Sequence, residues 1–171
     1  MTPMATARLH LRELTPDDAP FLLALLNDPD WIRNIGDRGV RSVDAARDYA
    51  VKGPIAMYAN RGFGLWMVET RDGTPTGMCG LIKRDTLEDV DIGFAFLPEF
   101  RGKGYAFEAA TASLAVAAKL GMKRVVGIVS FHNADSIALL VKLGFAFERP
   151  IRMPNDSEDI ALYAKAIDAK D

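Results

Sequence analysis

Seven stretches of this chain have the residue pattern of β-strands. The first, Ala7–Glu13, alternates leucines with Arg and His side chains, which is the period of a strand with one buried face. The others are apolar, β-prone runs bounded by glycine, proline or polar residues. These later strands are expected at Phe63–Thr70, Thr76–Lys83, Val90–Leu97, Arg124–Ser130, Phe145–Arg149 and Ile160–Ala166.

Two helices are predicted between the first and second of these strands. The segment Thr15-Pro16-Asp17-Asp18 supplies a hydroxyl cap, a proline at the first helical position and acids in the first turn. An apolar stripe follows it, and this helix should end at Asn27–Pro29. Ser42 is expected to cap a second short helix over roughly Val43–Lys52, with a loop at Trp31–Val40 between the two.

Two more helices are expected in the second half of the chain. The segment Tyr105–Leu120 is apolar nearly all round and is followed by Gly121, so it should be a largely buried helix with a left-handed cap. Asn133 or Asp135 should cap a helix that runs to Leu143. This order of elements predicts an α/β fold with a mixed sheet covered by helices, in a single domain over residues 1–171.

Composition restricts the classes of ligand and location. The formal net charge of -2 and a pI of about 5.7 leave no positive excess for nucleic acid or an anionic membrane surface. The single cysteine, Cys79, excludes a disulfide framework and a multi-cysteine metal site, and we expect a small buried hydrophobe and no metal. No apolar run approaches the roughly 20 residues of a membrane span. Because Met1–Arg12 also lacks the apolar core of a signal peptide, a cytoplasmic protein is expected.

The stretch Asp91–Glu108 combines the features of an anion-binding site. An apolar run is stopped by Pro98, and the glycine-rich segment Arg101–Gly104 then leads into a helix. Glycines let the backbone approach a ligand closely, and a helix N-terminus presents unpaired N–H groups with a partial positive charge. Arg101 and Lys103 add full charges, so we expect a ligand that carries phosphate.

Two common nucleotide motifs do not match this loop. A P-loop needs Ser or Thr after its Gly-Lys, whereas Gly102-Lys103 is followed by Gly104. A Rossmann fingerprint needs a third glycine where this chain has Phe107, and it opens a βαβ unit instead of lying in the middle of the chain. A nucleotide-binding switch without either motif is a competing hypothesis, and it predicts affinity for ATP or GTP.

A third motif does match. Arg101-x-x-Gly104-x-Ala106 fits the R/Q-x-x-G-x-G/A signature, and the chain resembles the GNAT superfamily of acetyl-CoA-dependent N-acetyltransferases. The opening Arg8–Asp18 is similar to the RimJ/RimL-like branch, which includes ribosomal-protein N-terminal acetyltransferases. The resemblance covers nearly the whole chain and extends to Asp91–Phe94, Tyr105–Ala109, Asn133-x-x-Ser136, Lys142–Phe145 and Asp159–Tyr163. It implies a mostly antiparallel central sheet of about six to seven strands, splayed at the coenzyme site and flanked by about four helices.

The resemblance also implies where acetyl-CoA binds. Backbone N–H groups of the glycine-rich loop would hold the pyrophosphate, and the pantetheine arm would lie beside the preceding strand at Phe96 and Leu97. Asn133 matches an asparagine near this arm in relatives, and it is equally suited to capping a helix. The coenzyme contacts expected on this basis are Phe96, Leu97, Arg101, Gly102, Lys103, Gly104, Tyr105, Ala106, Asn133 and Ser136.

Acetyl transfer from a thioester to an amine needs a neutral amine, a stabilised oxyanion and a protonated leaving thiolate. By resemblance, the backbone N–H of Leu97 is the expected oxyanion donor, and Asp91 is the expected base, acting through water. A solvated strand carboxylate is the alternative interpretation of Asp91, and Glu69 is a second candidate base. Ser136 is the expected acid, with capping of a helix as its alternative role.

One position departs from the wider superfamily. Many members carry a tyrosine that protonates the thiolate where this chain has Leu140, whereas the RimL-like branch has the serine that Ser136 matches. The main hypothesis is an N-acetyltransferase in which a primary amine, from a protein N-terminus or a small molecule, attacks acetyl-CoA directly in a ternary complex. The alternative is a coenzyme-A-binding sensor or a degenerate family member without transfer.

The acceptor is expected to contact Trp31–Tyr58, the Pro154–Glu158 loop and Trp66. Acidic side chains in this part of the chain could attract a cationic amine or a basic peptide, although solvated loop charges explain them equally well. These acidic residues are Asp28, Asp30 and Asp37. A homodimer is compatible with the resemblance, but no sequence feature indicates one.

Overall fold

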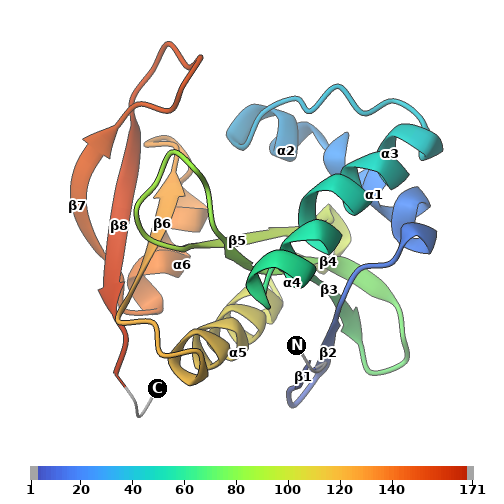
Figure 1. Cartoon of the computed structure of the whole chain (residues 1–171), viewed down its shortest axis with the longest axis horizontal. Coiled ribbons are helices and arrows are strands. Elements are labelled where there is room, and N and C mark those ends of the chain that lie inside the picture. The colour runs from blue at the N-terminus through green and yellow to red at the C-terminus, as the bar shows by residue number, and fades with distance from the viewer. Residues whose placement is uncertain (1–3, 169–171) are drawn as a thin grey trace.

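The computed structural model describes residues 4–168, and its centre is a sheet of eight strands in the order β1-β2-β3-β4-β5-β6-β8-β7 (Figure 1). Neighbouring strands are antiparallel except β5 and β6, which are parallel, so the predicted mixed, mostly antiparallel sheet is confirmed. The strands are β1 (Met4–Ala5), β2 (Leu9–Arg12), β3 (Leu65–Thr70), β4 (Pro75–Ile82), β5 (Asp91–Phe96), β6 (Arg124–Val129), β7 (Ala146–Ile151) and β8 (Ile160–Ala166).

All four predicted helices are present, and the structure adds two short ones. The helices are α1 (Ala19–Leu26), α2 (Pro29–Asn34), α3 (Val43–Ala50), α4 (Ala56–Arg61), α5 (Tyr105–Lys119) and α6 (Ala134–Lys142). The added helix α2 begins at Pro29, where the sequence predicted only the end of the first helix. The carboxylate of Asp28 accepts a hydrogen bond from the Trp31 N–H at 3.3 Å, and Pro29 occupies the first helical position. The same residues therefore stop α1 and start α2.

The helix predicted to end near Lys52 continues instead to Arg61. A π-helical turn, Val51–Ile55, joins α3 to α4 and contains Pro54. Proline lacks an N–H and its ring crowds the preceding turn, and the wider π turn accommodates both defects without breaking the helix. The helix ends at Gly62, which has a left-handed φ of 78°.

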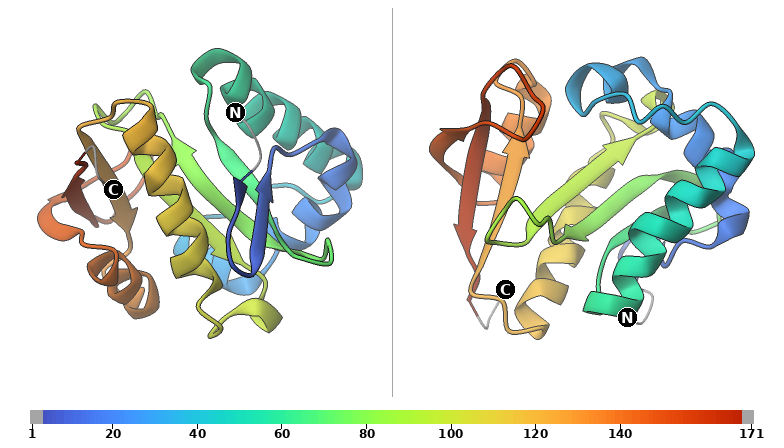
Figure 2. Two further views of the ribbon diagram at one scale, coloured as in Figure 1. Left: turned by 90° about the horizontal axis from the view of Figure 1, so that it is seen from below. Right: turned by 45° about the horizontal axis from the view of Figure 1, so that its top comes forward.

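Successive side chains of the sheet point to opposite faces and bury two separate cores. On one face, Trp66, Val68 and Cys79 pack with the apolar side of α5. On the other face, Met67 and Met78 pack with α1, α2 and α3. Figure 2 shows α5 on the opposite side of the strands from α1 and α3. Cys79 is fully buried, as predicted, and burial raises the pKa of its thiol to about 12.

The parallel strands β5 and β6 separate almost as soon as they meet. β4 and β5 pair from Ile82↔Asp91 to Gly77↔Phe96, whereas β5 and β6 share the single register pair Asp91↔Val126. The hydrogen bond from the Val126 N–H to the Val90 carbonyl, 2.9 Å, lies at this junction. In Figure 1 the two arrows then point apart. The sheet is thus splayed at β5, as the resemblance implied.

We predict that Gly80→Ala destabilises the fold by about 3 kcal/mol. A Cβ at this position would lie 2.1 Å from the Gly64 carbonyl oxygen and 2.9 Å from the Leu65 Cα, so β3 and β4 would be forced apart. Urea unfolding measures the loss. The control is Gly73→Ala, where φ is +86° but nothing lies within 4 Å of a Cβ, so only backbone strain of about 1 kcal/mol is expected. Equal losses in the two variants would contradict the prediction.

Candidate functional site

The segment that joins β5 to α5 has the backbone geometry of an anion-binding loop. A 3-10 turn, Pro98–Phe100, is followed by Gly102 and Gly104 with left-handed φ values of 72° and 80°. The Glu108 N–H donates the first intrahelical hydrogen bond to the Gly104 carbonyl, 3.1 Å. The N–H groups of Tyr105–Phe107 therefore precede the helical ladder and lie at the positive end of the α5 dipole. The loop can hold an anionic group such as a pyrophosphate.

The edge of β5 that faces β6 carries unpaired backbone groups. The Leu97 N–H donates to the Thr76 carbonyl on β4, 3.0 Å, so Leu97 directs its backbone polar groups at β4. Because the orientation alternates along a strand, Phe94 and Phe96 direct theirs toward β6. Consistent with this, the Phe96 carbonyl accepts a hydrogen bond from Arg101 Nε, 2.9 Å, and not from β4. The expected oxyanion donor, the Leu97 N–H, is therefore already used inside the sheet.

The side chain of Arg101 is bound to the protein. Besides its bond to Phe96, its Nη2 donates to Asp28 Oδ2 at 2.7 Å and its Nη1 to Asp30 Oδ2 at 2.5 Å. The predicted contact of Arg101 with a coenzyme is thus left to its backbone. Sequence reasoning missed both acidic partners, which were considered only as possible attractants for an acceptor.

Asp91 lies at the one position where β5 and β6 still pair. Its side chain is 2% exposed, Arg84 Nε donates to its Oδ2 at 3.1 Å, and its buried Oδ1 has no partner among the described residues. Burial raises the pKa of Asp91 to about 6, and the charge of Arg84 opposes only part of this rise. The alternative interpretation as a solvated strand carboxylate is therefore wrong. A carboxyl with this pKa exchanges a proton near neutral pH.

The start of α6 faces the same region from the end of β6. Asn133 Oδ1 accepts a hydrogen bond from the Ser136 N–H, 3.3 Å, so both residues take part in the cap that was their alternative role. The amide nitrogen of Asn133 and the hydroxyl of Ser136 are not used by this bond. Leu140, which replaces the tyrosine of many relatives, is 2% exposed and packs against Gly127. It is a core residue.

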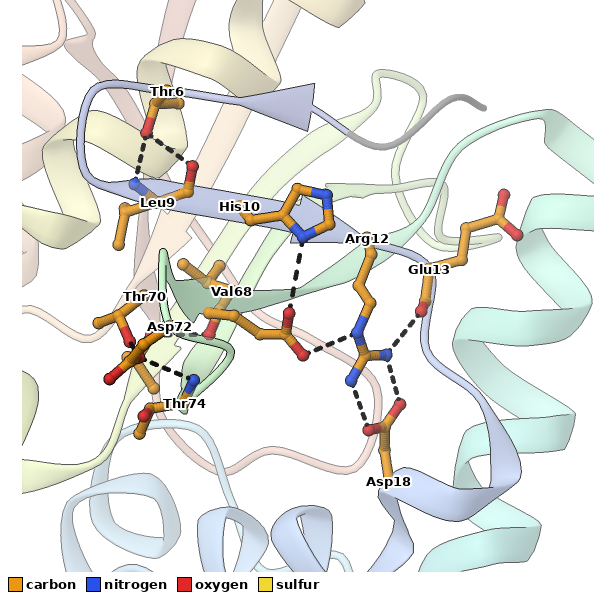
Figure 3. A network of polar contacts seen from close by, with 12 residues as sticks. Thr6, Leu9, His10, Arg12, Glu13, Asp18, Val68, Thr70, Asp72 and Thr74 are labelled. Carbon is orange, nitrogen blue, oxygen red and sulfur yellow. Dashed lines mark hydrogen bonds and ion pairs between the residues drawn. The ribbon is translucent and has the colours of Figure 1, made fainter.

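The second candidate base, Glu69, belongs to a network on β2 and β3. Figure 3 shows Arg12 paired with Asp18. Arg12 Nε also donates to Glu69 Oε1 at 2.8 Å. His10 Nδ1 lies 3.6 Å from Oε2 of the same side chain. With one oxygen bound by Arg12 and with β4 between β3 and β5, Glu69 fits the role of base less well than Asp91 does.

Long-range contacts brace the loop from the N-terminal segment. Arg8 donates from Nη1 to the Lys103 carbonyl, 2.7 Å, and from Nε to Glu108 Oε2, 2.7 Å. Thr6 donates to the other oxygen of Glu108, 2.6 Å. A surface cavity of about 520 Å³ begins beside Gly104 and is lined also by Arg8 and Lys142. Sequence reasoning missed Arg8, because its partners lie about a hundred positions away and no local pattern links them.

The residues expected to contact an acceptor are only partly accessible. Trp66 is 1% exposed in the core of the α5 face, so its predicted contact with an acceptor is wrong. Asp37 is ion-paired with Arg41 at 2.6 Å, and Asp28 and Asp30 are bound by Arg101. These carboxylates therefore offer little uncompensated negative charge to a cationic acceptor.

The described part of the chain contains neither a metal-binding cluster nor a membrane-spanning helix. No group of three or more His, Cys, Asp or Glu side chains in residues 4–168 could hold a metal ion. In the same range, no helix combines the length and the apolar character needed to cross a bilayer.

Comparisons with known proteins agree with this geometry. Residues 8–146 match the family described as "Acetyltransferase (GNAT) domain". The uncharacterized N-acetyltransferase YoaA of Bacillus subtilis is 27% identical over 154 residues, covering 87% of this chain and 85% of that protein.

Solved acetyltransferases share the fold at lower identity. The ribosomal L7/L12 α-N-protein acetyltransferase RimL, in complex with coenzyme A, has a TM-score of 0.84 at 20% identity and covers 98% of this chain and 99% of its own. Spermidine N-acetyltransferase from Vibrio cholerae, in complex with coenzyme A and spermine, has a TM-score of 0.78 at 18% identity, with 95% and 97% covered.

We predict that Asp91→Asn gains stability relative to the wild type as the pH rises. Burial raises the pKa of Asp91 from 3.8 to about 6, so the native state keeps a proton that the unfolded chain loses first. The wild type is therefore destabilised as the pH rises through these two values, by about 3 kcal/mol over the whole titration and about 2 kcal/mol between about pH 4.5 and about pH 8, and the neutral amide is not. Urea unfolding of both proteins at about pH 4.5 and about pH 8 measures the change. A stability difference independent of pH would contradict the prediction.

Proposed function

The chain belongs to the GNAT acetyltransferase family, and from this premise we propose that it is an N-acetyltransferase. It transfers the acetyl group of acetyl-CoA to a primary amine by direct attack in a ternary complex. The observation that carries the proposal is the single register pair between β5 and β6, next to a loop of free N–H groups at the start of α5. The diverging strands offer a site for the extended pantetheine arm, and the adjoining loop offers a site for the pyrophosphate.

Acetyl-CoA fits these two sites in a defined order. Its pyrophosphate binds the backbone N–H groups of Gly102 to Ala106, with Lys103 adding charge. Its pantetheine amides lie against the β6-facing edge of β5, where the Phe94 carbonyl and the Phe96 N–H have no strand partner. Asn133 and Ser136 contact the arm from α6. The cavity beside Gly104, with Arg8 and Lys142 in its lining, leaves room for the nucleotide beyond the loop.

The reaction needs two proton transfers. Asp91, through water, removes a proton from the ammonium so that the neutral amine attacks the thioester carbon. The Phe94 N–H, which faces the splay and lies nearer to Asp91 than the Phe96 N–H does, replaces Leu97 as the donor to the tetrahedral oxyanion. When the C–S bond breaks, the attacking nitrogen loses its extra proton and the coenzyme thiolate gains it, and Ser136 is the candidate on α6 that relays this proton. The products are the acetylated amine and free coenzyme A.

The acceptor is an amine of low total charge, and we favour a protein N-terminus of the RimJ/RimL-like kind or a small monoamine over a polyamine. Two solved proteins of this fold act on a ribosomal protein and on spermidine, so both classes are compatible with the architecture. The carboxylates near α2 are neutralised by arginines in this chain, which disfavours strong attraction of a polycation.

Release of the thiol from acetyl-CoA across a panel of monoamines, polyamines and peptides tests the function, with mass spectrometry of the product to locate the acetyl group. Acceptor-dependent release and an N-acetyl product support the proposal. Tight coenzyme binding without turnover on any acceptor would favour a coenzyme A sensor. Displacement of acetyl-CoA by ATP or GTP would favour a nucleotide-binding switch.

We predict that Gly104→Val lowers affinity for coenzyme A at least about tenfold. Gly104 has a φ of +80°, and a Cβ there would lie 3.1 Å from Arg8 Nη2, so a valine strains the loop backbone and displaces the guanidinium that braces the loop. Gly121→Val, at the other end of α5 with a φ of +77° and no atom within 4 Å of a Cβ, carries the same backbone strain away from the loop. Calorimetric titration should show wild-type affinity in the Gly121 variant. Equal affinity in both folded variants would place the site elsewhere.

We predict that kcat/KM of the wild type falls below about pH 6, as the carboxyl of Asp91 becomes protonated. Asp91→Asn should lower kcat strongly and remove this limb of the pH profile. Arg84→Gln should move the limb to higher pH, because the Arg84 charge lowers the pKa of Asp91. Profiles that are identical in the wild type and Asp91→Asn would exclude Asp91 as the base.

A further inference from the structure

Arg101 fastens the coenzyme loop to helix α2. The three nitrogens of its guanidinium donate to three acceptors. These are the Phe96 carbonyl at the end of β5 and the carboxylates of Asp28 and Asp30 at the start of α2. Asp28 Oδ2 also accepts from the Trp31 N–H as the cap of α2. One side chain thus connects the last residue of β5, the coenzyme loop and the first turn of α2.

The other end of α2 is hydrogen-bonded to the residue that follows β6, the strand that diverges from β5. Ser130 directly follows β6, and its Oγ donates to the Asn34 carbonyl at the end of α2, 3.3 Å. Helix α2 is therefore attached to the chain after β5 at one end and to the chain after β6 at the other. In Figure 1 it lies above the two diverging arrows, and Figure 2 (right) shows it on the same side. It spans the wide end of the splay.

The burial of Asp28 decides where the Arg101 guanidinium stays. The Asp28 side chain is only 6% exposed, whereas that of Asp30 is 42% exposed. If the guanidinium turned toward a phosphate in the loop, it would leave a buried carboxylate without a counter-charge, which costs far more than the loss of an exposed ion pair. The loop itself offers free N–H groups for the phosphate, so no such exchange is needed.

We propose that Arg101 is a positioning residue and not a phosphate ligand. Through its bond to Asp28 it holds α2 across the open end of the splay, and its Nε binds the Phe96 carbonyl. The coenzyme loop and the α2 side of the site therefore move as one unit. The inference rests on the proposed function, since it concerns the same coenzyme site. It departs from the expectation that Arg101, as the first residue of the signature, adds charge for the phosphates. Loosening α2 should then weaken coenzyme binding, because the Arg101 side chain links α2 to the loop.

A double-mutant cycle on coenzyme A affinity tests this, using the full chain and calorimetric titration. Arg101→Gln and Asp28→Asn should each weaken binding by a similar factor, about tenfold, and the double variant should be no weaker than either single one. Asparagine still caps α2, so Asp28→Asn removes the ion pair and keeps the cap. Arg47→Gln, which breaks an exposed ion pair with Asp44 on α3 outside this cluster, should bind like the wild type.

Two further measurements separate positioning from phosphate contact. Arg101→Lys keeps a cation at the loop but cannot reach three acceptors at once, so it should weaken binding as much as Arg101→Gln does. S-Acetylpantetheine, which has no phosphate, should lose kcat/KM as a donor by the same factor as acetyl-CoA in Arg101→Gln.

Four results would overturn the inference: unchanged or tighter binding in Asp28→Asn, independent losses that multiply in the double variant, wild-type affinity in Arg101→Lys, or a loss confined to phosphate-bearing donors. Failure of the wild type to bind coenzyme A would instead refute the proposed function itself.

Discussion

The early end of the parallel pairing between β5 and β6 is the constraint on which the site depends. After Asp91↔Val126 the strands diverge, and the backbone groups of Phe94 and Phe96 on that edge lose the partner that a continuous sheet would supply. Unpaired backbone groups inside a protein cost free energy unless a side chain, water or ligand satisfies them. Arg101 satisfies the Phe96 carbonyl, and the remaining groups form an edge suited to an extended amide-bearing ligand.

The same junction separates two electrostatic environments. Asp91 lies at the closed end, where burial raises its pKa and one carboxylate oxygen stays unpartnered. The glycine loop lies beyond the open end, exposed and electropositive through its free N–H groups rather than through its arginine. In the function proposed above, the anion is held at the exposed end and proton transfer takes place at the buried end. This separation suits a coenzyme that is charged at one end and reactive at the other.

Much of the fold could be predicted because its signals are local. Caps at Ser42 and Asn133, the glycine after α5 and the alternation of the strands each depend on a few neighbouring residues. Helix boundaries were predicted wrongly where the same residues are compatible with two local structures. Asp28-Pro29 both ends α1 and begins α2, and Pro54, a helix breaker by its local chemistry, is accommodated by a π turn. Packing against neighbouring elements decides between such outcomes, and a single sequence does not record it.

The sequence by itself determined the glycine loop, the strand before it and the helix after it, because the backbone angles that such a turn needs restrict the residues at Gly102 and Gly104. Only the tertiary structure decided what the polar side chains around it do. Arg101 turned to Asp28 and Asp30, Arg8 reached Glu108, and the Leu97 N–H paired with Thr76. Charge and hydrogen-bonding capacity are visible in a sequence, but the choice among partners depends on distances and burial that exist only after the chain has folded.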